Sequence, residues 1–269
     1  MPVGKLWKQY IQDIKNSFDE LNEHDDSQTI FTEENIAKLP ALVRQHIING
    51  GYLNRPAMKN MLVNFHNTKF KISAGNKPIN IKFMQVNFTK RPDRNAFLKS
   101  KIFGIPLEAK DSVIDGHGSM TVTLAKLFQL FNATGSEMDQ SQLITALADA
   151  VYMPSLFLEN FVSLKTLDDH SVEGRITWKG VSARGIFTFD NSGSIIRFDT
   201  GDRYMDTGKT SSLTPWYVTY SNYREQNGYF QPGSISVNWA LPDSVDTYFT
   251  SDNIEIKYSI LPLPLTFCL

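Results

Sequence analysis

The sequence of 269 residues predicts an α+β protein in which a large, curved, half-barrel-like antiparallel β-sheet packs against N-terminal helices and a central helical insertion. Three observations predict this fold. Apolar residues at helical spacing are confined to the first 56 residues and to one central segment. Elsewhere, apolar and polar residues alternate in short runs. The links between these runs are short, so successive strands are expected to pair antiparallel.

Residues 1–56 are predicted to form a helical segment. Within residues 5–21, apolar side chains recur three and four positions apart, at Leu6, Tyr10, Ile14, Phe18 and Leu21. This spacing predicts an amphipathic helix that packs on the sheet domain or, as an alternative, contacts a membrane surface. Two shorter helices are expected to follow, one starting at Thr32 and one after Pro40 that stops at Asn49-Gly50-Gly51.

Residues 57–269 are predicted to form the sheet domain, and we expect it to make one structural unit with residues 1–56. Ile79–Lys90 is one expected strand. Within its part INIKFMQVNF, residues 79–88, the alternation slips midway, which predicts a bulge or a change of buried face. The other expected strands share the alternating pattern: Lys59–Ser73, Phe97–Ile105, Val113–Leu124, VEGRITWKG, SARGIFTFD, SIIRFDTGDRY, Trp216–Arg224, Ser234–Ala240, Asp246–Thr250 and Asn253–Ile260.

The central insertion is predicted to be a helix over residues 139–153. Asp139 followed by Gln142 has the spacing of a capping box. Pro154 disfavours helical angles at the residue before it, so the helix is expected to stop near Tyr152 or Met153.

Composition and charge narrow the classes of function. The 27 basic and 28 acidic residues give a formal charge of −1, which argues against nucleic acid as a partner. The single cysteine, Cys268, makes no disulfide within the chain. No run approaches the ~20 apolar residues of a membrane helix, and the amphipathic N-terminus lacks the apolar core of a signal peptide. We therefore expect a cytoplasmic or membrane-peripheral protein.

The usual signatures of catalysis and of metal or cofactor binding do not occur in the sequence. No GxSxG, SxxK or Walker A motif is found, and the five histidines lack metal-site spacing. We therefore predict no catalytic residue, no metal and no cofactor. His117, between two glycines, is expected in a turn at the start of a strand. Asp149 and Tyr152 lie beside one another on the central helix. Asp149 is either a structural or exposed acid, or a group that binds a ligand or takes part in catalysis.

Aromatic residues are the more informative candidates. Trp178, Trp216 and Trp239 fall in the C-terminal strand region beside polar or tyrosine residues. They are either ordinary sheet core or the lining of an apolar cavity on a partly open face.

Six blocks of the sequence, in order, resemble an uncharacterised family of bacterial proteins without an assigned activity. The family's blocks run, loosely, LP-x-x-V-x-R-Y, D-x-x-G-x-G, R-Y-L-x-E-x-x-W-x-P, F-x-F-D-x-x-G, a Trp, and G-x-x-x-P before a Trp. The similarity spans about residues 31 to 260 of this chain. The blocks in this sequence are LPALVRQHIINGG (39–51), IDGHGSMTVTLAKLF (114–128), LITALADAVYMPSLFL (143–158), FTFDNSGSIIRFDTGDRY (187–204), TPWYVTYSNYREQNGYFQP (214–232) and ISVNWALPDSVDTYF (235–249).

This chain departs from the family in its central block. The family's arginine is replaced by Ile144 or Thr145, its glutamate by Asp149 and its tryptophan by Tyr152. If that trio were catalytic, this chain would be a doubtful catalyst, whereas an architectural trio would tolerate the changes. The order of sheet and helix also resembles the half-barrels of lipoprotein carriers, a likeness of fold that by itself says little about function.

Three hypotheses follow from the sequence. The first is a non-enzymatic protein that binds an apolar small molecule or a lipid in the cup of a curved sheet. Its candidate ligand-binding residues are Asp149, Tyr152, Trp178, Arg203, Trp216 and Trp239. The second is an enzyme of unknown reaction, which requires Asp149, Arg203 and His117 to converge in one cleft. The third is a structural or protein-interaction module with an exposed apolar patch and no pocket.

Overall fold

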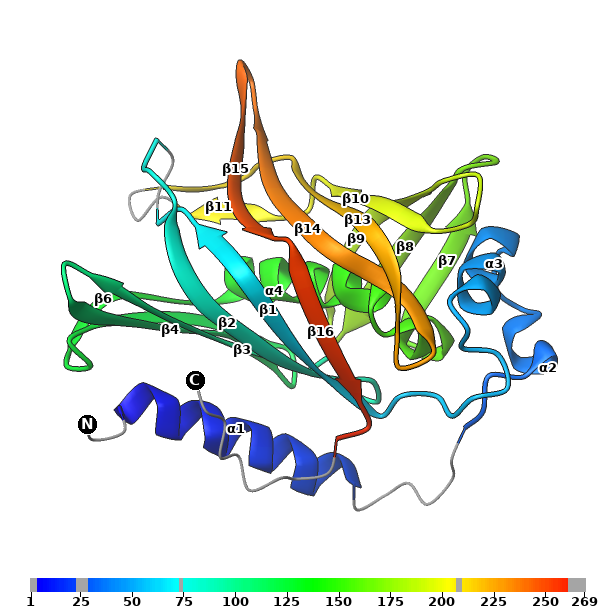
Figure 1. Ribbon diagram of the computed structural model, residues 1–269, viewed down its shortest axis with the longest axis horizontal. Helices are drawn as coiled ribbons and strands as arrows, with labels where there is room; N and C mark the ends of the chain where they lie inside the picture. Colours follow the sequence, from blue (N-terminus) through cyan, green and yellow to red (C-terminus); the bar gives the residue numbers. More distant parts are fainter. Residues whose placement is uncertain (1–3, 23–28, 73–74, 207–209, 261–269) are drawn as a thin grey trace.

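The computed structural model describes residues 4–22, 29–72, 75–206 and 210–260. Among these residues, fourteen strands form one antiparallel sheet that curls around a central helix (Figure 1). The strand order is β6-β5-β4-β3-β2-β1-β15-β14-β13-β10-β9-β8-β7, and β16 pairs with β1 off this path. A separate two-stranded sheet joins β11 and β12. The fold class predicted from the sequence, an α+β fold with a curved antiparallel sheet, is confirmed.

The first six strands form three hairpins and are followed by the central helix. Their bounds are β1 (Asn60–Phe70), β2 (Ile79–Phe88), β3 (Arg94–Ile102), β4 (Ile105–Ile114), β5 (His117–Leu124) and β6 (Phe128–Thr134). The later strands are β7 (Val162–Thr166), β8 (Ser171–Trp178), β9 (Val181–Phe189), β10 (Ile195–Thr200), β11 (Tyr204–Asp206), β12 (Ser211–Leu213), β13 (Trp216–Gln226), β14 (Tyr229–Leu241), β15 (Ser244–Ser251) and β16 (Asn253–Tyr258).

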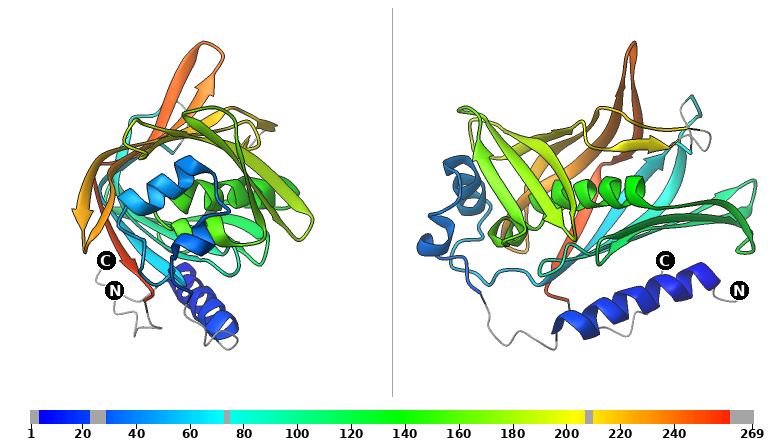
Figure 2. Two further views of the ribbon diagram at one scale, coloured as in Figure 1. Left: turned by 90° about the vertical axis from the view of Figure 1, so that its right-hand side faces the viewer. Right: turned by 180° about the vertical axis from the view of Figure 1, so that it is seen from behind.

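Helices lie at three places around the sheet (Figures 1 and 2). The central helix α4 (Ser136–Ala148) lies in the concavity and continues into two 3₁₀ turns, η1 (Asp149–Val151) and η2 (Pro154–Leu158). The short helices α2 (Glu33–Ile36) and α3 (Ala41–Asn49) lie at the end nearest β7 and β8, whereas α1 (Lys5–Asn22) lies beneath β2–β4 on the convex face. No helix among the described residues has the length and apolarity that crossing a membrane requires.

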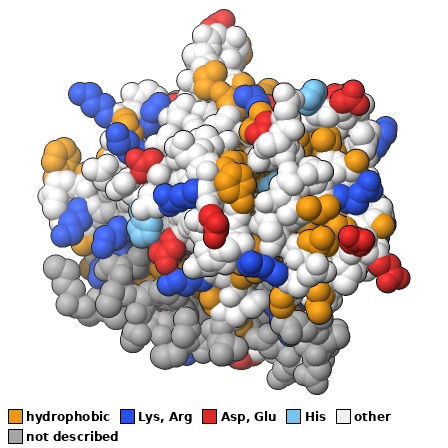
Figure 3. Space-filling model, turned by 45° about the vertical axis from the view of Figure 1, so that its right-hand side comes forward, with side chains coloured by type: hydrophobic (Ala, Val, Ile, Leu, Met, Phe, Trp, Pro, Cys, Tyr) orange, Lys and Arg blue, Asp and Glu red, His pale blue; other side chains and the backbone are white. Residues whose placement is uncertain are grey.

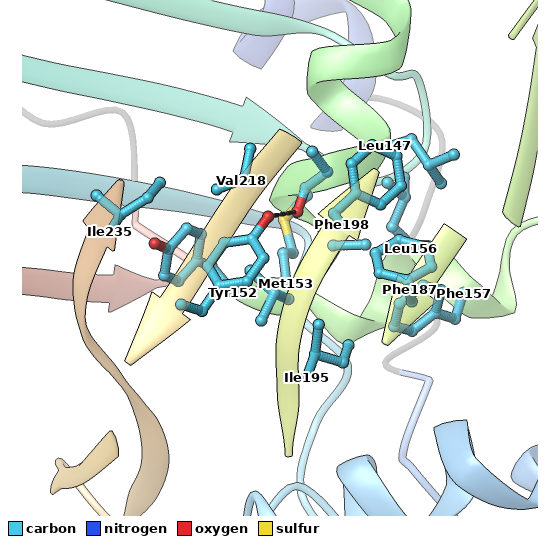
Figure 4. Packing of buried hydrophobic residues seen from close by; sticks show 14 of the residues in the cluster. Leu147, Tyr152, Met153, Leu156, Phe157, Phe187, Ile195, Phe198, Val218 and Ile235 are labelled. Carbon is cyan, nitrogen blue, oxygen red and sulfur yellow. Dashed lines mark hydrogen bonds between the residues drawn. The ribbon is translucent and has the colours of Figure 1, made fainter. Parts of the chain in front are cut away.

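The main hydrophobic core lies where α4, η1 and η2 meet β8–β10 (Figure 4). Phe187 is fully buried there, and its ring packs 4.7 Å from that of Phe198 and 5.4 Å from that of Phe157. The hydroxyl of Tyr220 on β13 donates to the backbone oxygen of Ala148 at 2.8 Å, which ties the end of α4 to the sheet. These contacts fix the position of α4 inside the concavity.

A second hydrophobic cluster lies on the convex face, between α1 and strands β1–β3. The predicted apolar stripe of α1 supplies Leu6, Tyr10, Ile14 and Phe18, and β2 supplies Met84, Val86 and Phe88. This packing explains the slip in the alternation of residues 79–88. The second half of β2 is buried on both faces, because α1 covers one face and the concavity encloses the other. The only register shift between β1 and β2 in the described chain falls between Phe65 and Thr68 of β1.

Several element boundaries differ from those predicted. The helix predicted at residues 139–153 begins at Ser136, and Asp139 does not cap it, because its carboxylate accepts from the backbone N–H of Gly118 at 2.6 Å. The α-helix ends at Ala148 rather than near Tyr152, and 3₁₀ turns continue the chain.

The strands β6, β7, β11 and β12 were not predicted separately. The predicted cap at Thr32 is confirmed as a capping box with Asn35. The Cys268 prediction lies outside the described residues. The division of the chain at residue 56 stays a prediction.

Candidate functional site

A cavity of about 720 Å³ lies on the concave side of the sheet, beside α4. It is lined by residues of β1–β6, α4, β11 and β13–β15 and is partly open to solvent. Its volume falls in the range of roughly 300–1,000 Å³ that is typical of small-molecule sites. Apolar side chains dominate the lining, among them Phe65, Phe83, Leu98, Leu107, Met120, Val122, Phe131, Val218, Ile235, Val237 and Phe249.

The inward-facing side chains on β3–β5, both large ones such as Leu98 and Met120 and small ones, leave the space toward the opposite wall unfilled. Ala96 and Ala109 occupy inward positions on β3 and β4, and Val122 occupies one on β5. On β9 and β10, in contrast, the inward positions hold the rings of Phe187 and Phe198, which pack against one another. The helix α4 therefore seals tightly against one part of the sheet and leaves a hollow against the other.

One wall of the cavity carries a polar network, which we call the Arg94 cluster: Gln85, Asn87, Arg94, Asp111, Gln142 and Asp149. One carboxylate oxygen of Asp149, Oδ2, accepts from Gln85 Nε2 at 2.9 Å, Asn87 Nδ2 at 3.0 Å and Arg94 Nε at 3.1 Å. The guanidinium of Arg94 also donates to Asp111 Oδ2 at 2.8 Å and to Gln85 Oε1 at 3.2 Å. The amide of Gln142 donates to Asp111. Strands β2, β3 and β4 thereby join the end of α4.

Burial determines the electrostatics of the Arg94 cluster. Burial raises the pKa of Asp149 above its ordinary value, and the charge of Arg94 together with the amides of Asn87 and Gln85 opposes this shift. For Arg94, burial disfavours the charged form, but the carboxylates of Asp111 and Asp149 outweigh it and raise the pKa of the guanidinium. The hydrogen bonds among these groups make the cluster a polar junction between β2–β4 and α4, in which Asn87 Oδ1 is buried without a partner.

A second polar feature of the lining is Arg203, which precedes β11 and stacks on two tryptophans. Its guanidinium lies 4.7 Å from the ring centroid of Trp216 and 5.7 Å from that of Trp239, which face each other across β13 and β14. Its Nη1 donates to the backbone oxygen of Ser141 at 2.7 Å and to the hydroxyl of Thr145. Trp216 Nε1 donates to the hydroxyl of Tyr248 at 3.0 Å. Cation–π contacts thus join an aromatic wall to α4.

The rim of the cavity carries one ion pair, from Lys71 Nζ to Asp246 Oδ1 at 2.7 Å. Apart from this pair, Asp206, the Arg94 cluster and Arg203, the described lining has no other charged side chain, and it includes no histidine. The described residues also contain no group of three or more His, Cys, Asp or Glu side chains that could hold a metal ion.

Four of the six residues proposed from the sequence line this one cavity: Asp149, Arg203, Trp216 and Trp239. Tyr152 lies one layer behind the lining, fully buried, with its ring 6.4 Å from that of Phe65 and 5.8 Å from that of Tyr220. Trp178 lies away from the cavity at the end of β8, where it packs 5.1 Å from the ring of Phe161. His117 is exposed at the start of β5 and also lies outside the lining, so the structure does not bring Asp149, Arg203 and His117 into one cleft.

Sequence reasoning missed the partners of Asp149. Gln85, Asn87, Arg94, Asp111 and Gln142 were not proposed as site residues. Their signal was a polar residue at an inward position of an otherwise apolar alternation, as at Gln85 in INIKFMQVNF. Such a signal identifies a buried polar residue but does not identify its partner, because strand pairing decides which polar residues meet.

The fold and the cavity define an open antiparallel half-barrel with a central helix and an apolar hollow. The model of a family of unknown function, DUF6544, matches residues 29–251, and the chain belongs to this family. Among solved structures, the chain is similar to a LolA superfamily protein from Nitrosomonas europaea, at 10% identity and a TM-score of 0.42, over 82% of this chain and 94% of that one. At that TM-score the likeness carries no argument about a ligand. No curated protein matches the sequence.

Proposed function

We propose that this protein binds an apolar or amphiphilic small molecule, such as a lipid, in the cavity beside α4. The observation that carries the proposal is a hollow of about 720 Å³ with a predominantly apolar lining, on the concave side of the sheet beside α4. An apolar void has no partner atoms for the side chains around it, so a ligand that fills it gains their contacts. Each buried methylene of that ligand contributes about 0.8 kcal/mol before the costs of binding.

The polar groups of the lining favour binding over catalysis. Asp149 accepts three hydrogen bonds through one oxygen, and Arg94 is held between Asp149 and Asp111. The charged groups of the Arg94 cluster bind one another, and they provide a polar end against which the head of an amphiphile fits.

The first experiment is native mass spectrometry of the protein purified from its own source. We expect a co-purifying apolar or amphiphilic molecule that organic extraction removes. The extracted protein should then bind a fluorescent fatty acid, with quenching of the emission of Trp216 and Trp239, because both rings line the cavity.

A cavity-filling variant tests the location of the site. Val122→Trp adds a large side chain at a half-buried position that faces the cavity from β5. If the introduced ring keeps two methylenes of the fatty acid from being buried, the affinity for the fatty acid falls about ten-fold. The matched control is Thr121→Trp, at the neighbouring position on the opposite face of the same strand. Equal affinities for the two variants, or an extracted protein that binds no probe, would refute the proposal.

A further inference from the structure

Two neighbouring turns at one end of the sheet expose a group of large apolar side chains. Phe103 and Ile105 belong to the turn between β3 and β4, and Leu127, Phe128 and Leu130 belong to the hairpin of β5 and β6. We call these five residues the apolar tip. The two turns are adjacent, because Leu107 of β4 pairs with Leu124 of β5 and the N–H of Ala125 donates to the oxygen of Pro106 at 2.7 Å. The hairpins reach the left end of the molecule in Figure 1.

The exposure of the apolar tip is exceptional for a described surface. Phe103 is 101% exposed, Leu127 is 81% exposed and Phe128 is 66% exposed. Single exposed apolar residues are ordinary, but contiguous ones mark interaction sites. On the face of the molecule that Figure 3 shows, hydrophobic side chains instead occur in small groups separated by charged and polar ones.

Phe103 is unfavourable for the turn in which it stands. Ile102 pairs with Ile105, so Phe103 and Gly104 are the two central residues of a tight hairpin, with φ of 48° and 81°. Turns with positive φ at both central residues prefer Asn-Gly, and a bulky residue in this conformation is an outlier. The ring of Phe103 is also fully exposed among the described residues, so no burial there offsets this cost.

The apolar tip is continuous with the wall of the cavity. Leu130 belongs to the tip and also lines the cavity. Ile102 of β3 and Leu107 of β4, in the strands that the first turn joins, line the cavity as well. A surface that covers the tip therefore also meets the edge of the cavity. This continuity links the tip to the hollow without requiring that the hollow hold a ligand.

Lysines flank the tip. Residues 97–107 and 121–131 contain three lysines, Lys99, Lys101 and Lys126, and no acidic residue. Lys82 lies directly across from Lys99 on β2, and Lys99 also lies 4.3 Å above the ring of Trp7 in α1. Burial lowers the pKa of Lys99, Glu108 opposes this shift, and Lys126 and Lys82 add to it by repulsion. Like charges placed this close destabilise the isolated protein. The buried Glu108, 3.9 Å from Lys126, is the acid that offsets them.

We propose that the apolar tip docks on an anionic lipid bilayer, with its apolar side chains in the interfacial region and the flanking lysines at the head groups. Exposed aromatic and leucine side chains beside basic ones are the features of a protein that lies on an anionic membrane surface. Docking in this way places the edge of the cavity at the bilayer. The inference goes beyond ligand binding in the cavity and stands on the turns and the lysines alone.

The test is sedimentation of the full chain with phosphatidylcholine vesicles, with and without phosphatidylglycerol. We expect binding to the mixed vesicles that weakens with salt, and weaker binding to pure phosphatidylcholine. Lys101→Ser should reduce the affinity about five-fold, because one basic residue near an anionic surface contributes a factor of that size. Lys165→Ser is the matched control, since Lys165 is an exposed lysine in β7 at the opposite end of the molecule (Figure 1).

Phe103→Asn separates docking from folding. Asn suits the turn better than Phe, so the midpoint of thermal unfolding should stay the same or rise, while vesicle affinity falls about ten-fold or more. Ile48→Ser, at a 44% exposed position in α3 at the other end, should leave vesicle affinity unchanged. Val122→Trp should also retain vesicle binding, so loss of the cavity ligand and loss of docking are distinguishable.

Three results would overturn the proposal. The first is a wild-type chain that does not sediment with the mixed vesicles. The second is a Phe103→Asn variant that binds them as tightly as the wild type. The third is a dimer in size-exclusion chromatography that Phe103→Asn dissociates while neither protein binds vesicles, which would assign the apolar tip to a second copy of this chain.

Discussion

Two parts of the same sheet differ in how they meet α4. In the packed half, strands β7–β10, inward rings such as Phe187 and Phe198 fill the space up to the helix, and η2 adds Phe157. In the hollow half, strands β1–β6, small inward residues such as Ala96 and Ala109 stand among larger ones such as Phe83 and Leu98, and a cavity of about 720 Å³ remains. Both halves have the same antiparallel pairing. The difference teaches that side-chain packing against α4, rather than the pairing of the strands, decides where this fold is hollow.

The hollow half is stabilised from its other side. The helix α1 buries apolar side chains against the convex face of β1–β3, so that these strands have a dry face even though their concave face borders the cavity. The Arg94 cluster adds hydrogen bonds between β2, β3, β4 and the end of α4. A sheet with one dry face and a hydrogen-bonded junction on the other tolerates a cavity that would be costly in a single-layer core.

The largest contrast is expected when a side chain is truncated in each half. Phe187→Ala in the packed half leaves a cavity among close-packed rings and should cost about 3–5 kcal/mol of unfolding free energy. Met120→Ala in the hollow half removes atoms that already border a void, and should cost about 1 kcal/mol or less. Urea unfolding of both variants measures the difference. Equal losses would show that the cavity is not hollow in solution.

A pH titration tests the packed half next. His46 on α3 is buried, and burial lowers its pKa from 6.5 to about 4, although contacts with the backbone of Val151 and Gly193 oppose the shift. Because the folded state resists protonation, the stability from this group is fully present above pH 6.5 and is lost as the pH falls toward 4. The loss amounts to about 3 kcal/mol.

The measurement is urea unfolding between pH 7 and 4 for the wild type and for His46→Gln. Over this pH range, His46→Gln should lose about 3 kcal/mol less unfolding free energy than the wild type does. His117→Gln, which changes an exposed histidine, should follow the wild type. Parallel curves for the wild type and His46→Gln would contradict a buried, neutral His46.

The smallest expected effects come from added volume. Gly185 lies in β9, and a Cβ there would meet the ring of Phe198 at 2.2 Å and the backbone oxygen of Asp199 at 2.8 Å. Gly185→Ala should therefore cost about 1–3 kcal/mol by overpacking. Val122→Ile adds one methylene toward the cavity of the hollow half and should change the stability by about 0.5 kcal/mol or less. Thermal unfolding of both variants measures the two losses of stability. A larger loss for Val122→Ile than for Gly185→Ala would contradict the difference between the packed half and the hollow half.

Prediction from the sequence worked best where the signal was local. The periodicity of residues 5–21, the cap at Thr32 and most strands were predicted from neighbours in the sequence and are confirmed. The start of α4 was predicted wrongly, because Asp139 has the spacing of a capping residue but bonds to Gly118, which is distant in sequence. Of the proposed site residues, Asp149, Arg203, Trp216 and Trp239 line the cavity, whereas Tyr152 and Trp178 do not. No local pattern distinguishes these two groups.

The sequence by itself determined the α+β class, the amphipathic N-terminal helix, the antiparallel strands and the proline that follows the central helix. These depend on spacing and backbone preferences, which each segment carries on its own. Only the tertiary structure decided that Asp149 meets Arg94, that Arg203 stacks on Trp216 and Trp239, and that the sheet is packed at one end and hollow at the other. The reason is that register and curvature bring distant residues together, and the space left between them depends on the side chains of both walls at once.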